Sequence, residues 1–104
     1  MSIDQTDVID SIGIDNLTGT IVLSISDHLE WDNKHLLLLQ EKLNTYVGFI
    51  ESKEILDTYP DARDRDVLID VICKYLPDQN AKVFLTNVNH IVKKAGINFS
   101  YRVL

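Results

Sequence analysis

The sequence predicts an α+β fold, a two-layer sandwich in which two helices cover one face of a four-stranded mixed sheet. Short segments rich in β-branched residues alternate with two long segments whose apolar residues recur every three or four positions. Their order along the chain is strand, strand, helix, strand, helix, strand. Each strand has one apolar face and one mixed or polar face, which indicates that the helices lie on one side only.

The first two strands are predicted at residues 6–14 and 20–26. Both are rich in β-branched residues, and Ile21, Leu23 and Ile25 fall on one side of the second strand. Four of the five residues between them, at positions 15, 16, 18 and 19, are turn formers. The two strands therefore should pair as an antiparallel hairpin.

The first helix is predicted over residues 33–51. Its apolar stripe consists of Leu36, Leu39, Leu43, Tyr46, Val47 and Ile50. Two further leucines, Leu37 and Leu38, lie beside the stripe, so this helix is either apolar over a wide arc or contacts something beyond its own sheet. A short helical turn is expected at residues 54–59, where Pro60 ends it.

The second half of the chain predicts a strand, a helix and a final strand. Residues 66–76 alternate as a third strand, and residues 97–104 alternate as a fourth. Between them, Asp78 caps a helix that ends before Gly96. Right-handed crossovers with both helices on one side allow the sheet order 1-2-3-4 or 2-1-3-4.

Length and composition indicate one globular domain, residues 1–104. Apolar types make up 45% and charged types 25% of the 104 residues, as in an ordinary soluble protein. There is no apolar run long enough to cross a membrane, and the acidic N-terminal stretch does not resemble a signal peptide. One cysteine is typical of a reducing compartment, so we expect a cytoplasmic protein.

The charge is unevenly distributed along the chain. The net charge is -6, and residues 1–33 contain seven acidic residues and no lysine or arginine: Asp4, Asp7, Asp10, Asp15, Asp27, Glu30 and Asp32. An acidic chain is repelled by nucleic acid and by anionic membranes, so neither is expected as a partner. An acidic surface can attract a basic protein, although acidic residues also serve solubility.

The densest group of potentially catalytic side chains follows the second strand: Asp27, His28, Glu30, Trp31, Asp32 and His35. On a helix, Asp32 could bind a metal together with either His28 or His35, but the two histidines would lie roughly 10 Å apart along the axis. We therefore expect no metal and no cofactor. The alternative is structural: Asp27 or Asp32 caps the helix, Glu30 completes a capping box, and Trp31 seals the edge of the core.

Other candidate residues are isolated. Cys73 lies in the middle of the third strand and is expected to be buried and inert, and His90 lies off the apolar stripe of its helix. Arg63 and Arg65 belong to a loop of alternating charge. The two could grip a carboxylate or a phosphate, and with Trp31 they are the candidate binding residues.

Several stretches resemble a known family: residues 26–32, Leu36 to Leu39, residues 40–44, residues 49–52 and residues 59–62. They are similar to a family of small bacterial proteins classed only as a domain of unknown function. The resemblance covers most of the chain and implies a small soluble bacterial protein, but it implies no activity for any residue. Lys53 stands where we expect a glycine to end the first helix.

These observations favour a non-catalytic cytosolic interaction module, either an accessory or an immunity-type protein, that presents an acidic N-terminal surface to a basic partner. The alternative is a small metal-assisted or acid-base hydrolase centred on Asp27, His28, Asp32 and His35. A homodimer fits either hypothesis. It would form through Leu37 and Leu38, or through the open face of the sheet that carries Leu68 and Ile72.

Overall fold

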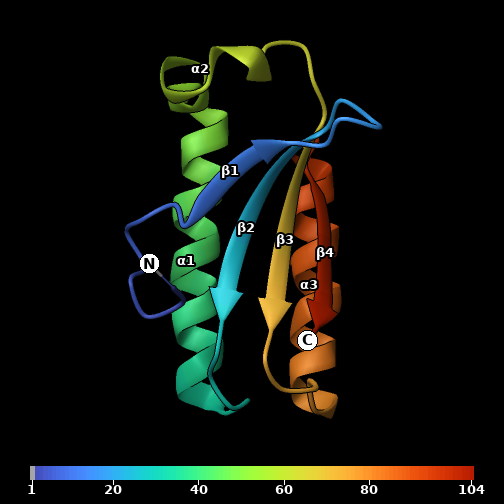
Figure 1. Cartoon of the computed structure of the whole chain (residues 1–104). Helices are drawn as coiled ribbons and strands as arrows, with labels where there is room; N and C mark the ends of the chain where they lie inside the picture. Colours follow the sequence, from blue (N-terminus) through green and yellow to red (C-terminus); the bar gives the residue numbers. More distant parts are fainter. Residues whose placement is uncertain (1) are drawn as a thin grey trace.

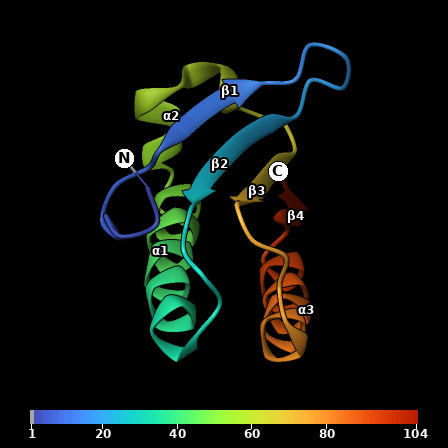
Figure 2. The same cartoon turned by 60° about the horizontal axis from the view of Figure 1, so that its bottom comes forward.

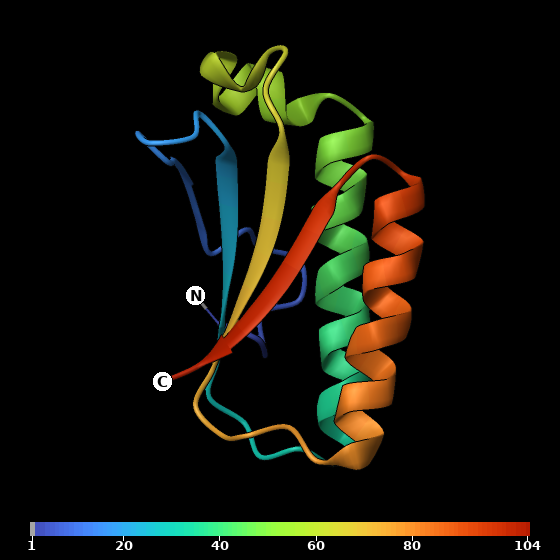
Figure 3. The same cartoon turned by 90° about the vertical axis from the view of Figure 1, so that its right-hand side faces the viewer.

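Strands and helices form two layers in the computed structural model, which describes residues 2–104 (Figure 1). The elements are β1 (Ser11–Ile14), β2 (Ile21–Asp27), α1 (Asn33–Glu51), α2 (Glu54–Thr58), the 3-10 helix η1 (Pro60–Ala62), β3 (Val67–Cys73), α3 (Gln79–Lys94) and β4 (Asn98–Val103). Helices α1 and α3 lie side by side on one face of the sheet (Figures 2 and 3). The predicted α+β fold class is confirmed.

The sheet has the order β1-β2-β3-β4, the first of the two predicted orders. β1 pairs antiparallel with β2, whereas β2 with β3 and β3 with β4 pair in parallel, so the sheet is mixed as predicted. Both parallel pairs are joined by a helix. Because β2, β3 and β4 run in the same direction, α1 and α3 run parallel to each other.

The core lies between the sheet and the two long helices. Buried residues of β2 and β3 meet buried residues of α1 and α3, and the main contributors are Ile21, Leu23, Ile25, Leu39, Leu43, Tyr46, Ile69, Val71, Leu85 and Val92. Of the stripe predicted for the first helix, Leu39, Leu43 and Tyr46 are buried in this core and Val47 and Ile50 pack against it, whereas Leu36 is half-buried outside it. None of the helices in the described part of the chain combines the length and the apolar character that a membrane span requires.

No helix covers the opposite face of the sheet in the part of the chain described here (Figure 3). Strand register places Leu68 and Ile72 on this face, where both are half-buried. Their neighbours are largely polar. Asp70 accepts a hydrogen bond from Ser100 Oγ at 3.0 Å, and Arg102 Nε lies 3.2 Å from its other carboxylate oxygen. This face therefore carries more polar groups than Leu68 and Ile72 by themselves suggested.

The prediction of the first strand is wrong at its N-terminal end, because only Ser11–Ile14 pairs with β2. A buried lysine explains the difference. Lys42 Nζ donates to the backbone oxygens of Ser2, Gln5 and Val8 at 3.0, 2.7 and 2.7 Å, and to Asp10 Oδ1 at 2.6 Å. The Val8 carbonyl, within the predicted strand, and the carbonyls of Ser2 and Gln5, which precede that strand, converge on one ammonium group, so the segment before β1 turns.

The first helix ends at Glu51, as predicted, with Ser52 as its C-cap. The next residue, Lys53, has a φ of 68°, in the left-handed region where a glycine usually ends a helix. The short helix predicted nearby is confirmed as α2. Pro60 follows it but also begins η1, because its fixed φ and missing N–H suit the first position of a helix.

Smaller corrections concern the strand ends and one loop. The third strand stops at Cys73 rather than residue 76, and the fourth spans Asn98–Val103. Cys73 pairs with Asp27, the last residue of β2, so the parallel ladder ends there. The hairpin loop spans positions 15–20 and is one residue longer than predicted.

Candidate functional site

Asp27 and His35 form a buried pair at the junction between β2 and α1. Asp27 is the last residue of β2 and is 3% exposed, and His35 is in the first turn of α1 and is 1% exposed. His35 Nε2 lies 2.5 Å from Asp27 Oδ2. The other ring nitrogen, Nδ1, is 2.9 Å from the backbone oxygen of Glu30. Both nitrogens of the imidazole therefore have partners in the core.

The partners of the ring determine where its protons lie. A carbonyl oxygen only accepts, so the proton on Nδ1 is directed at the Glu30 carbonyl. Between Nε2 and Asp27 there is then one proton, which belongs either to an imidazolium beside a carboxylate or to a carboxylic acid beside a neutral imidazole. Both forms have a net charge of zero. The remaining carboxylate oxygen of Asp27 accepts from the Leu29 N–H at 3.2 Å.

Trp31 covers this pair. Its ring is stacked on the His35 ring, with centroids 4.0 Å apart and an interplanar angle of 18°. The indole N–H donates to the backbone oxygen of Tyr75 at 2.9 Å. Trp31 was a candidate binding residue in the sequence. In the structure its ring contacts His35 and its indole N–H contacts Tyr75, so both groups have partners within the protein.

Asp32 is the N-cap of α1, one of the two capping residues considered from the sequence. Its carboxylate accepts from the His35 N–H at 2.8 Å. The predicted cap is therefore confirmed as Asp32 and not Asp27, because the helix begins at Asn33 and the Asp27 carboxylate contacts the His35 ring. A capping box with Glu30 is wrong, since the third helical position is His35.

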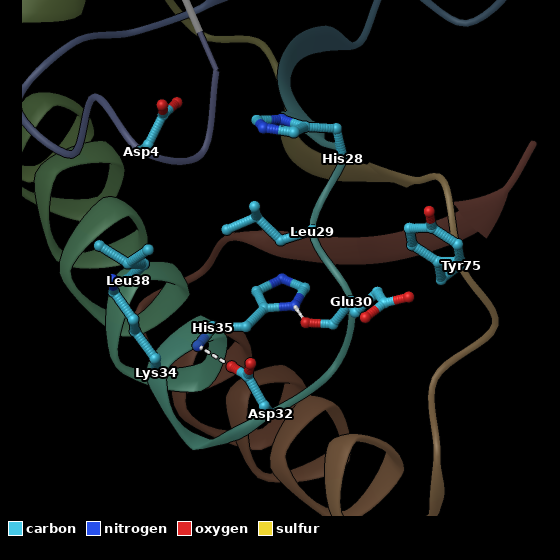
Figure 4. Close-up of a pocket in the computed structure, with 9 residues that line it drawn as sticks. All are labelled: Asp4, His28, Leu29, Glu30, Asp32, Lys34, His35, Leu38 and Tyr75. Atoms are coloured by element: carbon cyan, nitrogen blue, oxygen red, sulfur yellow. Dashed lines mark hydrogen bonds between the residues drawn. The ribbon is translucent and has the colours of Figure 1, made fainter.

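A recess of about 560 Å³ lies beside the pair and opens to solvent. Its lining residues are Asp4, His28, Leu29, Glu30, Asp32, Lys34, His35, Leu38 and Tyr75. Asp4, Glu30 and Asp32 are exposed, whereas Leu29 and Leu38 are half-buried. Figure 4 shows Asp4 and His28 on one side of the recess and Glu30 beside Tyr75. The rim is acidic and the floor partly apolar.

The Asp4 carboxylate is ionised at neutral pH. A hydrogen bond from the Ser2 hydroxyl lowers the pKa of Asp4, with a smaller contribution from the nearby His28. Residues 2–104 contain no group of three or more histidine, cysteine, aspartate or glutamate side chains arranged to hold a metal ion. A metal bound by His35 would have to displace one of the two ring contacts.

Cys73 is buried on β3, at the position that pairs with Asp27 on β2. It is 1% exposed, and burial raises the pKa of its thiol to about 12, assisted by the negative charges of Asp27 and Asp70. The thiol is therefore neutral at physiological pH and is a poor nucleophile. His90 is exposed on α3.

The two loop arginines have different surroundings. Arg65 donates from Nε to the Asp61 oxygen at 2.8 Å and from Nη1 to the Gly19 oxygen at 3.1 Å. A Cβ at Gly19 would lie 2.9 Å from Arg65 Nη1, and its φ of 76° also favours glycine. Arg63 lines a separate recess of about 380 Å³. For Arg63 and Arg65 to bind one anion together, Arg65 would have to lose its hydrogen bond to the Gly19 oxygen in the hairpin loop.

A second buried network is centred on Lys42, which the sequence did not indicate as a functional residue. Its Nζ pairs with Asp10, whose backbone N–H donates to Tyr46 Oη at 2.8 Å. The Tyr46 hydroxyl in turn donates to the Ser24 oxygen at 2.6 Å, and burial raises its pKa above the usual value. The sequence contains one sign that Lys42 is buried. It lies three residues after Leu39 and four before Tyr46, and is therefore on the apolar stripe of the helix.

Comparisons with known proteins assign no activity to this chain. Neither the curated proteins nor the solved structures provide a significant match to this chain. One family model matches residues 1–104, and it is described as a family of unknown function, DUF6572. The chain therefore belongs, over its whole length, to the family of unknown function DUF6572.

Proposed function

We propose that this protein is a non-catalytic interaction module of accessory or immunity type that binds a basic segment of a partner protein in the recess beside α1. The observation that carries the proposal is the acidic rim, formed by the exposed side chains of Asp4, Glu30 and Asp32. Three carboxylates against the single ammonium of Lys34 leave a charge of -2 when His28 is neutral.

A lysine or arginine side chain of a partner suits the recess. Its aliphatic stem would pack on Leu29 and Leu38, and its charged end would reach the rim carboxylates. The other acidic residues in positions 1–33 extend the negative field around the site and would accelerate the encounter with a basic partner.

The hydrolase alternative is less well supported by the surroundings of His35. A general base needs a free ring nitrogen within reach of a substrate, and both nitrogens of His35 are engaged in the core. Asp32, the other carboxylate of that hypothesis, caps α1. Of the four hydrolase candidates, only His28 is exposed without such a role in the contacts described above.

The proposal places the protein in the cytoplasm and gives it no nucleic-acid or membrane partner. Its support is the net charge of -6 and the single cysteine, Cys73. A phosphate backbone or an anionic lipid surface would be repelled by the same carboxylates that attract a basic protein.

Removing two rim charges should weaken the binding of a basic peptide. We expect the variant Asp4→Asn/Glu30→Gln to bind a fluorescent lysine- and arginine-rich peptide about tenfold more weakly in an anisotropy titration, with a smaller dependence on salt. Asp32 is left unchanged because its substitution would also remove the helix cap.

The matched control is Asp57→Asn/Asp64→Asn, which removes two charges from the other end of the molecule. It should retain the affinity of the unmodified protein. Equal losses in the two variants would mean that only net charge matters, and that result would contradict a binding site in the recess.

We also propose that the protein forms a homodimer through the helix layer. An apolar groove of about 260 Å³ lies between α1 and α3, and its lining residues are Gln40, Leu43, Asn44, Val47, Phe84, Asn87, Val88, Ile91 and Val92. Ile91 is 67% exposed, and Leu37, which is 63% exposed, lies on the same helical stripe as Gln40 and Asn44. Leu38, by contrast, packs against the core.

Charge complementarity favours a second copy as the occupant of this groove. Glu51 follows Asn44 and Val47 on the groove side of α1, and Lys94 follows Asn87 and Ile91 on that of α3. Both residues are in the last turn of their helices, and the helices run parallel. A two-fold axis along the helices would place each α1 against the partner's α3 and bring opposite charges together twice.

Light scattering across a concentration series tests the dimer. We expect a mass near twice 11.9 kDa at high micromolar concentration for the unmodified protein, and a monomer for Leu37→Lys/Ile91→Lys. The control is Leu17→Lys, since Leu17 is 96% exposed in the hairpin loop, away from the groove. A monomer at all concentrations would refute the proposal.

A further inference from the structure

The edge of the sheet formed by β4 has no partner in the described part of the chain. β4 pairs with β3 on one side only, and Figure 3 shows its other edge uncovered at the front of the molecule. An edge strand presents unpaired N–H and C=O groups, and proteins usually protect it with proline, lysine or a bulge. The six residues of β4 include neither proline nor lysine, and the Arg102 side chain is directed at Asp70.

A groove runs beside this edge, between β4 and α3. It has a volume of about 320 Å³ and is lined by Leu85, Thr86, Asn89, Phe99, Ser100 and Tyr101. Tyr101 and Val103 alternate along β4 and remain 41% and 40% exposed. In a strand added beside β4, every second side chain would point toward this groove. The backbone edge and the groove therefore form one continuous surface for an extended peptide.

The charge around this surface is positive. Residues 79–104 contain no aspartate or glutamate. Lys82 lies four residues before Thr86, and Lys93 four residues after Asn89, so both are on the face of α3 that borders the groove. Arg102, whose side chain is 67% exposed on the opposite face of β4, is already paired with the Asp70 carboxylate at 3.2 Å, so the two lysines carry the free positive charge of this surface.

We infer that β4 binds an extended acidic segment of another protein by strand addition. The backbone of the segment would pair with the free edge of β4. Its acidic side chains would reach Lys82 and Lys93 on the helix side. This surface is separate from the acidic recess, which has the opposite charge, so the two proposals stand or fall independently.

Titration with a synthetic peptide tests the inference. The probe is an eight-residue blocked peptide of alternating valine and glutamate, and the comparison peptide carries lysine in place of glutamate. We expect the glutamate peptide to shift the amide resonances of β4 and α3 in NMR spectra, with an affinity at these residues at least about tenfold higher than that of the lysine peptide. No shift of these resonances at millimolar glutamate peptide, or equal affinity of the two peptides at these residues, would overturn the inference.

Backbone methylation distinguishes strand addition from simple charge attraction. In a bound strand, alternate N–H groups face the neighbouring strand, so N-methylation of one alternate set should abolish binding while methylation of the other set should preserve it. Equal affinity of the two methylated peptides would show that the backbone does not pair, and would refute strand addition.

Reversing the charge of the two groove lysines tests where the peptide binds. Lys82→Glu/Lys93→Glu should weaken binding of the glutamate peptide about tenfold, whereas the control Lys53→Glu/Arg63→Glu, at the α2 end of the molecule, should change it less than about twofold. Asp4→Asn/Glu30→Gln should leave this affinity unchanged. Equal losses in the two charge-reversal variants would overturn the assignment to the β4 edge.

Discussion

Replacing Lys42 by methionine is expected to destabilise the protein by about 3–5 kcal/mol, the usual cost of removing one partner from a buried ion pair. Lys42 is fully buried and its ammonium group contacts Asp10 and three backbone oxygens. Methionine fills most of the space but leaves the Asp10 carboxylate without its counter-charge. Urea unfolding followed by circular dichroism measures the loss.

A double variant separates the charge from the packing. Lys42→Met/Asp10→Asn removes both charges, so it should recover part of the stability that Lys42→Met loses, although the carbonyl groups of Ser2, Gln5 and Val8 still lack a donor. Lys34→Met, on the exposed face of the same helix, should cost less than about 0.5 kcal/mol. A loss below about 1 kcal/mol for Lys42→Met would contradict the role assigned to this residue.

Replacing Asp27 by alanine is expected to destabilise the protein by about 3–5 kcal/mol, again because a buried partner is left alone. The His35 ring would keep its contact with the Glu30 carbonyl but lose the partner of Nε2. Asp32→Ala, which removes the cap of α1, should cost only about 0.5–2 kcal/mol. The fluorescence of Trp31, which is stacked on His35, provides a local probe of the same unfolding transition.

Asparagine at position 27 tests the shared proton. In Asp27→Asn the amide can donate to Nε2 of a neutral imidazole, and its oxygen can still accept from the Leu29 N–H. We therefore expect a loss of about 1–2 kcal/mol, well below that of Asp27→Ala. A catalytic Asp27 would behave in the opposite way, since removing a carboxylate from an active site commonly stabilises the protein. A neutral or stabilising Asp27→Ala would reopen the hydrolase hypothesis.

The fold class and the two long helices were predictable because their signals are local. Apolar residues at a spacing of three and four define the buried stripe of α1, and Asp78 accepts from the Ala81 N–H at the start of α3 as its position suggested. Alternation identified the strands in the same way. Each of these patterns depends on neighbours a few residues away, which the sequence displays directly.

The candidate site was predictable as a group of residues but not as a set of contacts. The composition of residues 27–35 indicated a candidate site. The choice between Asp27 and Asp32 as the cap, however, depends on where α1 begins in three dimensions. The structure places the helix start at Asn33, which leaves Asp32 at the cap and brings Asp27 to the His35 ring. The two residues are eight positions apart along the chain, and the turn between them determines whether they meet.

The sequence by itself therefore determined the α+β class, the order of the elements and the amphipathic faces of the helices, since periodicity is a property of the chain. Tertiary structure alone decided the sheet order, the shortened β1 and the partners of Lys42 and His35. These features depend on groups brought together from distant positions: Lys42 lies 40 residues from Ser2, whose carbonyl it binds. A buried charge must find its partners wherever the fold supplies them, and no local pattern records that choice.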